Sequence, residues 1–340
     1  MQIEMESEVR QSLTQDSWVI FLLGGQGSQY SEMARTLRER DETFQSWMAT
    51  LDEVAVLLTG RSIEQYVYEG STECDDLELS SLALFMVEYS LHRTIEARGV
   101  SPTAVVGSSL GEFIAFAVAG CANPETVMSG IHQFTQAAAR DLPSGGMVAV
   151  LGQADHVARM VEATPSTTLI SVHSSSHSVV SGLTAELDSL IDSLESAGLV
   201  CFRLPVHFPF HSSFVEVVRP QLVDVANRLH HRSREGLPRY SSATTGRVRH
   251  FDGTHAWNAV GQPIRFVPTI TAIPNHNRHV YVDLTPSASL ATILKSTGTD
   301  YETHSIITPF HTEEAAIDSL VARLDALGLL NPADPREALS

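Results

Sequence analysis

Two kinds of hydrophobic pattern alternate along most of the chain. Residues 18–23 and 104–106 are continuous apolar runs, which are typical of buried strands. Residues 82–98 and 124–138 instead repeat apolar residues at intervals of three and four, which predicts helices with one buried face. Strands that alternate with helices in this way indicate an α/β fold.

The pattern changes between residues 146 and 207. Apolar segments follow there in the order β-α-β-β-α-β, with strands at 147–151, 168–172, 178–181 and 200–204 and helices at 155–163 and 185–197. This order is that of a ferredoxin-like unit. We therefore predict that residues 146–207 form a small subdomain, inserted into a larger α/β subdomain built from residues 16–145 and 208–330. Residues 1–15 and 331–340 are predicted to be polar tails.

Composition narrows the class of protein. Apolar residues make up 43% of the 340 residues and charged residues 18%, which predicts a substantial core rather than disorder. The three cysteines are scattered and suggest neither a disulfide framework nor a thiolate metal site. The acidic N-terminal segment is unlike a signal peptide, and every apolar run is too short to span a membrane. We expect a cytoplasmic monomer without membrane contacts.

The charges are unevenly distributed. The net charge of −18 disfavours binding to nucleic acid. Positive charge is nevertheless concentrated in one stretch, at Arg228, Arg232, Arg234, Arg239, Arg247 and Arg249. This stretch is either an ordinary solvated loop or a docking patch for an acidic partner.

The clearest chemical signal is the segment G-S-S-L-G at residues 107–111. It lies between an apolar strand and a helix, which is the context that a G-x-S-x-G nucleophile turn requires. The tight turn would push the Ser109 hydroxyl outward, and the backbone N–H of Leu110 could stabilise an oxyanion. The alternative is a strand-to-helix turn with two incidental serines.

A serine nucleophile needs a base, and the chain has fifteen histidines. His211 is the candidate because it directly follows the inserted unit, although its position alone is weak support. The glycine-rich loop at residues 24–29 lacks both the spacing of a dinucleotide site and a phosphate-binding lysine. Gln26 in this loop could instead supply an oxyanion donor beside the serine.

A metal site is not expected. His173 and His177 stand four residues apart, a spacing that suits a metal on a helix. They fall in a strand–turn–strand segment without acidic or thiolate ligands nearby. We therefore predict neither a metal nor a cofactor.

Taken in order, these segments resemble the malonyl-CoA:acyl-carrier-protein transacylase family, which includes the acyltransferases of polyketide synthases. The resemblance covers residues 17–325. It rests on the segments GQGSQ at 25–29, GSSLGE at 107–112, FHS at 210–212, YSSATTG at 240–246, the stretch from Trp257 to Phe266, and VDLTP at 282–286.

The resemblance implies a fold and a mechanism. The fold is an α/β-hydrolase-like core with the ferredoxin-like subdomain closing over the site. Ser109 would be the nucleophile and His211 its base, with Gln26 and the Leu110 backbone as the oxyanion hole. A backbone carbonyl near residues 283–286 would orient the histidine. The implied partner is an acyl carrier protein, whose phosphopantetheine arm carries the acyl group.

One departure from the family changes the expected substrate. Members that take malonyl or methylmalonyl groups use an arginine on the helix after the serine turn. That position is His132 here, and a neutral histidine cannot bind a carboxylate bidentately. Binding of the carboxylate by another side chain is the alternative. The other residues expected to contact the acyl group are Ser108, Gln136, His173, Phe208 and Phe210.

Three functions remain open. The serine turn, the helix at residues 85–91 and the missing arginine resemble the acyltransferase-like acyl hydrolases of trans-acyltransferase polyketide synthases. Hydrolysis of non-malonyl acyl groups from carrier proteins is therefore the favoured hypothesis. The first alternative is a transacylase that moves such a group between carriers or from CoA. The second is an inactive docking homologue, which the retention of Ser109, His211 and Gln26 disfavours. The residues expected to meet the acidic carrier are Arg228, Arg232, Arg234 and Arg239.

Overall fold

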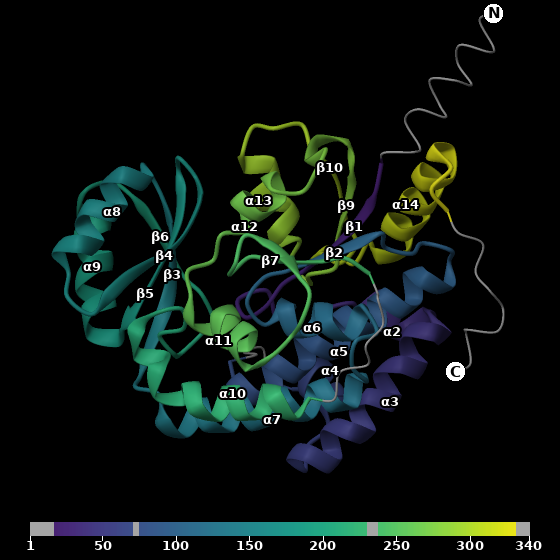
Figure 1. Cartoon of the computed structure of the whole chain (residues 1–340), viewed down its shortest axis with the longest axis horizontal. Coiled ribbons are helices and arrows are strands. Elements are labelled where there is room, and N and C mark those ends of the chain that lie inside the picture. The colour runs from purple at the N-terminus through teal and green to yellow at the C-terminus, as the bar shows by residue number, and fades with distance from the viewer. Residues whose placement is uncertain (1–16, 71–74, 230–236, 331–340) are drawn as a thin grey trace, which may run out of the picture.

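The computed structural model describes residues 17–70, 75–229 and 237–330. These residues form a mixed α/β structure with a six-stranded sheet and a separate four-stranded sheet. Figure 1 shows the larger sheet in the middle of the molecule, between helices above and below it, and the smaller sheet at one end.

The larger sheet has the strand order β10-β9-β1-β2-β7-β8. Its strands are β1 (Val19–Leu23), β2 (Ala104–Gly107), β7 (Arg239–Ser241), β8 (Gly246–Val248), β9 (Val280–Asp283) and β10 (Glu302–Ser305). All neighbours pair in parallel except β7 and β8, which are antiparallel. The carboxyl ends of the parallel strands therefore meet at one edge of the sheet, where loops can bring distant residues together.

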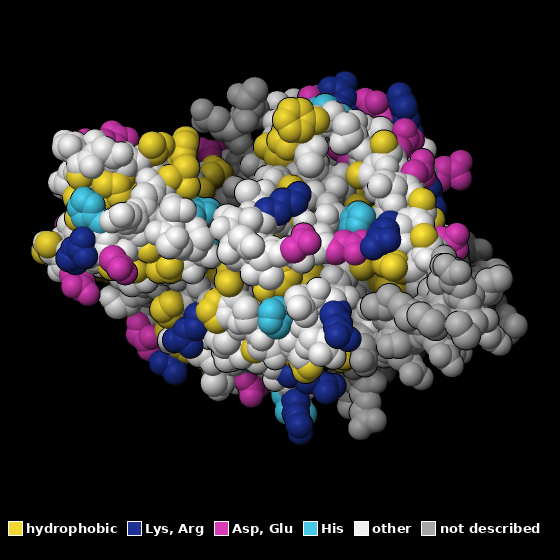
Figure 2. All heavy atoms as spheres, turned by 90° about the horizontal axis from the view of Figure 1, so that it is seen from above, with side chains coloured by type: hydrophobic (Ala, Val, Ile, Leu, Met, Phe, Trp, Pro, Cys, Tyr) yellow, Lys and Arg dark blue, Asp and Glu magenta, His cyan; other side chains and the backbone are white. Residues whose placement is uncertain are grey.

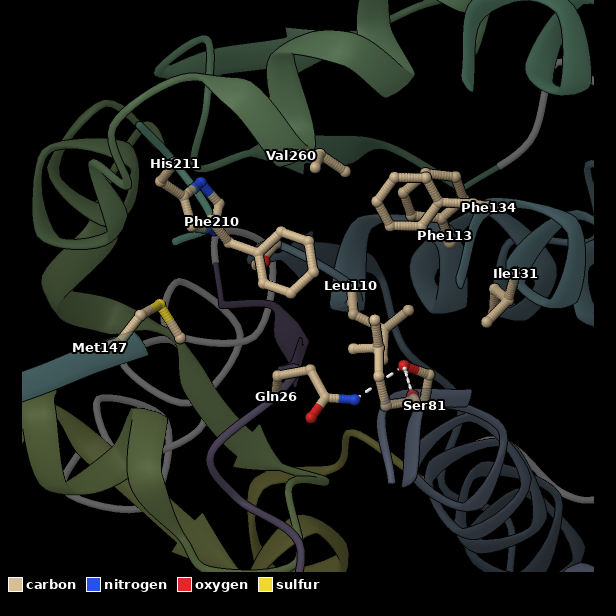
Figure 3. Close-up of a pocket in the computed structure, with 12 residues that line it drawn as sticks. Gln26, Ser81, Leu110, Phe113, Ile131, Phe134, Met147, Phe210, His211 and Val260 are labelled. Carbon is tan, nitrogen blue, oxygen red and sulfur yellow. Dashed lines mark hydrogen bonds between the residues drawn. The ribbon is translucent and has the colours of Figure 1, made fainter. Parts of the chain in front are cut away.

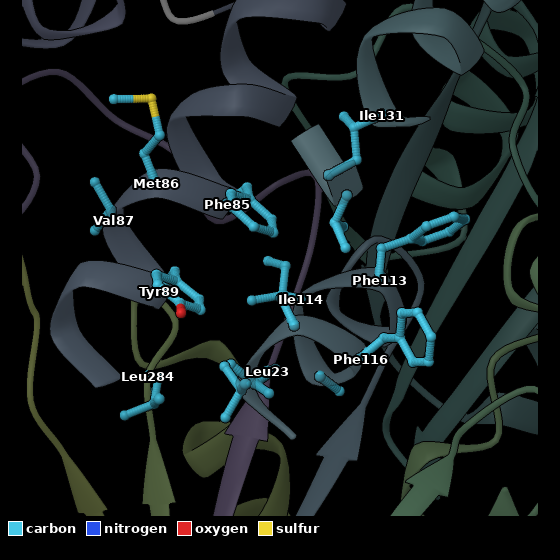
Figure 4. Close-up of a cluster of buried hydrophobic side chains, with 14 of the residues drawn as sticks. Leu23, Phe85, Met86, Val87, Tyr89, Phe113, Ile114, Phe116, Ile131 and Leu284 are labelled. Carbon is cyan, nitrogen blue, oxygen red and sulfur yellow. The ribbon is translucent and has the colours of Figure 1, made fainter. Parts of the chain in front are cut away.

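Strand β1 is buried on both faces, as its continuous apolar sequence predicts. Phe21 and Leu23 point to a core shared with α3 (Glu42–Thr59), α5 (Leu77–Ala97), α6 (Gly111–Val118) and α7 (Pro124–Asp141). Ile20 and Leu22 point to the other core, shared with α12 (Phe266–Thr271) and α13 (Ser289–Ser296). Figure 4 shows part of the first core, where Leu23 lies among side chains of α5 and α6.

The helices begin and end at residues that favour such boundaries. Asp41 and Asp76 accept hydrogen bonds from the first-turn N–H groups of α3 and α5. Asn123 precedes α7, but its side chain makes no such bond, and Pro124 is the first residue of the helix. In the described ranges, no helix is long and apolar enough to cross a membrane. The remaining helices are α2 (Arg35–Arg40), α4 (Ile63–Tyr68), α10 (Arg219–Arg228), α11 (Gly253–Gly261), α14 (Glu313–Leu327) and two 3₁₀ helices, Ser213–Val218 and His276–Arg278.

The smaller sheet is built from one continuous segment. Its elements follow in the order β3 (Gly145–Leu151), α8 (Ala154–Ala163), β4 (Thr167–Ser174), β5 (His177–Leu183), α9 (Thr184–Ser196) and β6 (Val200–Arg203). The strands are antiparallel in the order β4-β5-β3-β6. Both helices pack on one face of this sheet (Figure 1), and hydrophobic side chains reach the surface of the same unit in Figure 2. The exposed ones are Leu151, Val172, Val200 and Phe202.

Candidate active site

Ser109 lies in the turn between β2 and α6, and its backbone is left-handed, with φ of 57°. Two glycines make this turn possible. A Cβ on Gly111 would lie 2.1 Å from the carbonyl oxygen of Leu23, and a Cβ on Gly107 would lie 2.5 Å from the Cα of Glu112. Since backbone atoms cannot move aside cheaply, only glycine fits at both positions. The left-handed backbone conformation of Ser109 is strained, and such strain is typical of functional turns.

His211 lies against this serine. The Oγ of Ser109 is 2.9 Å from Nε2 of His211, and Nδ1 of His211 is 2.8 Å from the carbonyl oxygen of Gln262. Because a carbonyl can only accept, Nδ1 must carry the proton, which leaves the lone pair of Nε2 for the serine hydroxyl. Burial lowers the pKa of His211 to about 4, although the Gln262 carbonyl acts to raise it. The imidazole is therefore neutral at pH 7, as a general base must be.

The carbonyl that orients His211 is not where the sequence placed it. The predicted turn at residues 283–286 does not supply it; Gln262, between α11 and α12, does. Asp283 instead braces its own turn by accepting from the N–H groups of Thr285 and Ala291, at 2.9 and 2.7 Å. Burial raises the pKa of Asp283 to about 6.

The glycine-rich loop after β1 packs directly on the serine turn. A Cβ on Gly25 would lie 3.0 Å from the backbone nitrogen of Leu110, so the two backbones are in close contact. Neither the N–H of Gln26 nor that of Leu110 has an acceptor among the residues that the structure describes. The side-chain amide of Gln26 donates to Ser81 at 2.7 Å (Figure 3) and also to Ser80 at 3.1 Å. An oxyanion donor from Gln26 would thus be its backbone N–H.

Two buried glutamates hold these loops, and the sequence analysis missed the role of both. Glu112, within the serine turn motif, accepts from Ser241 Oγ at 2.9 Å and lies 2.6 Å from Nε2 of His255. Glu88 in α5 accepts from the N–H of Gly24 at 3.1 Å. Burial raises the pKa of Glu88 well above its ordinary value. In the sequence, Glu88 is only an acidic residue that follows the apolar run at residues 82–87.

A narrow cavity of about 30 Å³ opens beside the Ser109–His211 pair. In Figure 3, side chains of the serine turn and of α7 face Phe210 and His211 across it. Apart from the polar groups of Gln26, Ser81, Ser109 and His211, the described lining is apolar and consists of Leu77, Leu110, Phe113, Ile131, Phe134, Met147, Phe210 and Val260. Such a cavity suits an uncharged acyl group.

Almost the whole chain is similar to one known protein family. The family model described as the acyl transferase domain matches residues 20–329. The chain belongs to the acyl transferase domain family.

Individual members of the family are similar over nearly their whole length. The polyketide biosynthesis acyltransferase homologue PksD of Bacillus subtilis strain 168 is 32% identical over 304 residues, which cover 87% of this chain and 93% of that protein. The homologue BaeD of Bacillus velezensis is 29% identical over 309 residues, with coverage of 89% and 95%. A loading acyltransferase from the avermectin modular polyketide synthase superposes with a TM-score of 0.82 at 23% identity, covering 90% of this chain and 99% of that one. The last match shows a shared fold.

His132, expected at the position of the family's carboxylate-binding arginine, lies close to a carboxylate. His132 in α7 has its Nδ1 2.7 Å from Oε1 of Glu78 in α5. The residues beside them, Leu77 and Ile131, line the cavity. The sequence analysis missed Glu78, because the approach of α5 to α7 that pairs it with His132 cannot be read from the chain.

The other residues expected to contact the acyl group occupy different places. Phe210 lines the cavity of the acyltransferase. Ser108, Gln136, His173 and Phe208 are not among its lining residues; Ser108 and His173 are buried elsewhere, and Gln136 lies on the exposed side of α7.

The expected carrier-docking arginines are only partly described. Arg228 is exposed and pairs with Asp224 at 3.1 Å. Arg239 is half-buried and donates to the carbonyl oxygen of Arg249 at 3.1 Å. Arg232 and Arg234 lie outside the described residues.

Proposed function

We propose that this acyltransferase takes a non-malonyl acyl group from an acyl-carrier-protein thioester in polyketide biosynthesis and releases it as the free acid. Nε2 of His211 would accept the proton of Ser109 Oγ as that oxygen attacks the thioester carbonyl. The backbone N–H groups of Gln26 and Leu110 would stabilise the oxyanion. The C–S bond then breaks, and the imidazolium returns the proton to the leaving thiolate.

The second half of the reaction uses the same groups. Water gives a proton to Nε2 of His211 and attacks the carbonyl of acyl-Ser109. The C–O bond to the serine breaks, Oγ regains its proton, and the carboxylic acid leaves. The observation that carries the proposal is the continuous chain from Ser109 Oγ to His211 at 2.9 Å and on to the Gln262 carbonyl at 2.8 Å. It also argues against an inactive docking homologue.

Two features support a non-malonyl acyl group. None of the described lining residues is Lys or Arg, so the cavity offers no cation to a free carboxylate. The carboxylate of Glu78 lies 2.7 Å from Nδ1 of His132, next in sequence to the lining residue Leu77, where it would repel the carboxylate of a malonyl group.

Transfer to a second carrier protein is the alternative, and membership of the acyl transferase family favours it. Both reactions share the acyl-Ser109 intermediate and differ only in the acceptor that enters the site. We further propose that the larger unit is an α/β-hydrolase-like core, that the smaller one is a ferredoxin-like subdomain, and that the arginines near residue 232 meet the carrier. That the protein is a cytoplasmic monomer and that it needs no cofactor remain predictions from the sequence.

The test is intact-protein mass spectrometry of the enzyme with acetyl-, butyryl- and malonyl-loaded carrier protein, together with an unloaded second carrier. We expect the acetyl or butyryl mass to leave the donor and free acid to form, with no gain on the second carrier. A gain on the second carrier would establish the transacylase instead. Ser109→Ala should abolish both reactions, and turnover that survives in this variant would disprove the mechanism.

A further inference from the structure

The segment at residues 260–265, here called the strap, connects α11 to α12 and holds the catalytic histidine at one end. The carbonyl of Gln262 binds Nδ1 of His211 at 2.8 Å, and the carbonyl of Val260 accepts from the backbone N–H of His211 at 3.1 Å. Both bonds come from the strap's backbone. The orientation of His211 therefore depends on where the strap lies.

At its other end the strap is bound to the smaller sheet. The N–H of Ile264 donates to the carbonyl of Ile170 at 2.8 Å, and the Oγ of Ser171 donates to the carbonyl of Ile264 at 3.0 Å. Ile170 and Ser171 both belong to β4, an edge strand of that sheet. The smaller unit thus contacts the segment that orients His211.

An irregularity in β4 makes these two bonds possible. The pairing of β4 with β5 shifts register between Leu169 and Ser171, so Ile170 has no partner in β5. Leu169 packs on the core of the smaller sheet, whereas Ile170 is fully buried in the main core. A β-bulge on an edge strand redirects residues in this way, and bulges are frequent beside active sites.

Ser171 is held in turn by His173. Its Oγ is 3.2 Å from Nδ1 of His173, and both side chains are buried. Since Ser171 gives its proton to Ile264, Nδ1 of His173 must be the donor. Burial lowers the pKa of His173 to about 3, with His177 a smaller cause, so the ring is neutral at pH 7. His173, which the sequence assigned to the acyl group, instead supports Ser171.

One face of the strap is not closely packed against β4. A cavity of about 250 Å³ lies between it and β4 and is lined by both, including Ser171, Pro263 and Ile264. Side chains do not fill the space along this face of the strap, so its hydrogen bonds to β4 contribute to its position there.

We propose that Ser171 is a positioning residue for His211: through the strap it fixes the Gln262 carbonyl and so keeps the histidine in the Nδ1–H tautomer that can accept the proton of Ser109. The proposal rests on the proposed role of His211 as base. It also makes the smaller unit part of the catalytic apparatus, because a displacement of β4 would move the carbonyl that orients His211.

Three variants test the proposal. Ser171→Ala removes the bond to Ile264, and Ser171→Thr keeps a hydroxyl at the same place. Ser181→Ala is the matched control, because Ser181 is an equally buried serine of the same sheet whose Oγ has no partner within the described ranges. Each variant is checked for its melting temperature before its activity is measured.

The measurements are kcat and KM on an acetyl N-acetylcysteamine thioester, the rate at which a fluorophosphonate labels Ser109, and the ¹⁵N shifts of the His211 ring. In Ser171→Ala we expect kcat and labelling to fall about tenfold with little change in KM, because small misplacements of catalytic groups are costly. The ring shifts should show both tautomers. Ser171→Thr should recover most of the rate, and Ser181→Ala should match the wild type.

Equal rates and ring shifts in Ser171→Ala and Ser181→Ala would overturn the proposal. If Ser171→Ala does not fold, the same measurements on His173→Leu, which removes the bond to Ser171, decide the question by the same criterion. Failure of the proposed Ser109–His211 mechanism is distinguishable, because in that case the fluorophosphonate would not label Ser109 even in the wild type.

Discussion

At the scale of single residues, the site depends on two residues whose backbone conformation is left-handed. Ser109 has φ of 57° and His211 has φ of 61°, and neither is a glycine. Such a conformation costs on the order of 1 kcal/mol per residue and persists only where the surroundings enforce it. Glu112 and the strap supply that enforcement. The sequence indicates the two reactive residues, whereas their supports become visible only in the fold.

The contact between His132 and Glu78 gives a prediction about substrate selectivity. The double variant His132→Arg with Glu78→Gln places a free guanidinium beside the cavity and removes the opposing carboxylate. We expect kcat/KM for a malonyl thioester to rise about tenfold relative to the acetyl thioester, because arginine binds carboxylates bidentately. His132→Arg alone should gain less, since Glu78 would pair with the new arginine.

The control is Gln136→Arg, which adds the same charge to the exposed side of α7. Malonyl selectivity that rises as much in this control as in the double variant would contradict the role assigned to position 132.

At the scale of elements, the site exists because three elements approach one another at backbone distance. The end of β1, the loop after it and the start of α6 meet where glycine replaces larger residues. The ideal Cβ positions of Gly25 and Gly111 lie 3.0 Å and 2.1 Å from atoms of the neighbouring element. The glycine motifs that follow β1 and β2 are visible in the sequence, but the contact between them is not.

Gly111→Ala tests this contact. Its new methyl group would overlap the Leu23 carbonyl, and β1 cannot withdraw because it is buried in the middle of the sheet. We expect a loss of about 3 kcal/mol or more in the free energy of unfolding, measured with urea, together with loss of turnover.

Gly246→Ala is the control, because the nearest atom to its Cβ is a backbone oxygen 3.9 Å away. It should change the free energy of unfolding by less than about 0.5 kcal/mol. Similar losses in the two variants would mean that Gly111 is not needed for close contact.

At the scale of the whole molecule, folding buries ionisable groups whose charged forms are then disfavoured. Burial lowers the pKa of His92 and His173 to about 3 and that of His211 to about 4. Burial acts in the opposite sense on Asp283, whose pKa it raises to about 6. Because the histidines bind protons near pH 6.5 once unfolded, the free energy of unfolding should fall as the pH drops from about 6.5 towards 4. Asp283 remains protonated to a higher pH in the folded state than in the unfolded state. Its protonation as the pH drops therefore stabilises the folded state and offsets part of this fall.

His92 isolates one of these contributions, since it lies in α5 away from the proposed chemistry. Between its folded and unfolded pKa values the unfolded chain binds one more proton, which is worth up to about 1.4 kcal/mol per pH unit. His92→Gln should lower the slope of unfolding free energy against pH by up to that amount, as measured by urea unfolding from pH 6.5 to 4. The comparison variant is His250→Gln, which replaces an exposed histidine. The same slope in His92→Gln and the wild type would refute this assignment.

The sequence by itself determined the α/β class, most of the strands and helices, and the family. These follow from local periodicity and from short motifs such as G-S-S-L-G, whose residues are neighbours in the chain. Only the tertiary structure decided that Gln262 orients His211, that Glu78 lies beside His132, and that β4 contacts the strap. These contacts join residues 51, 54 and 93 positions apart, or involve a backbone carbonyl that any residue could supply. The pattern of side chains along the sequence does not predict such contacts, because tertiary packing rather than local sequence brings the partners together.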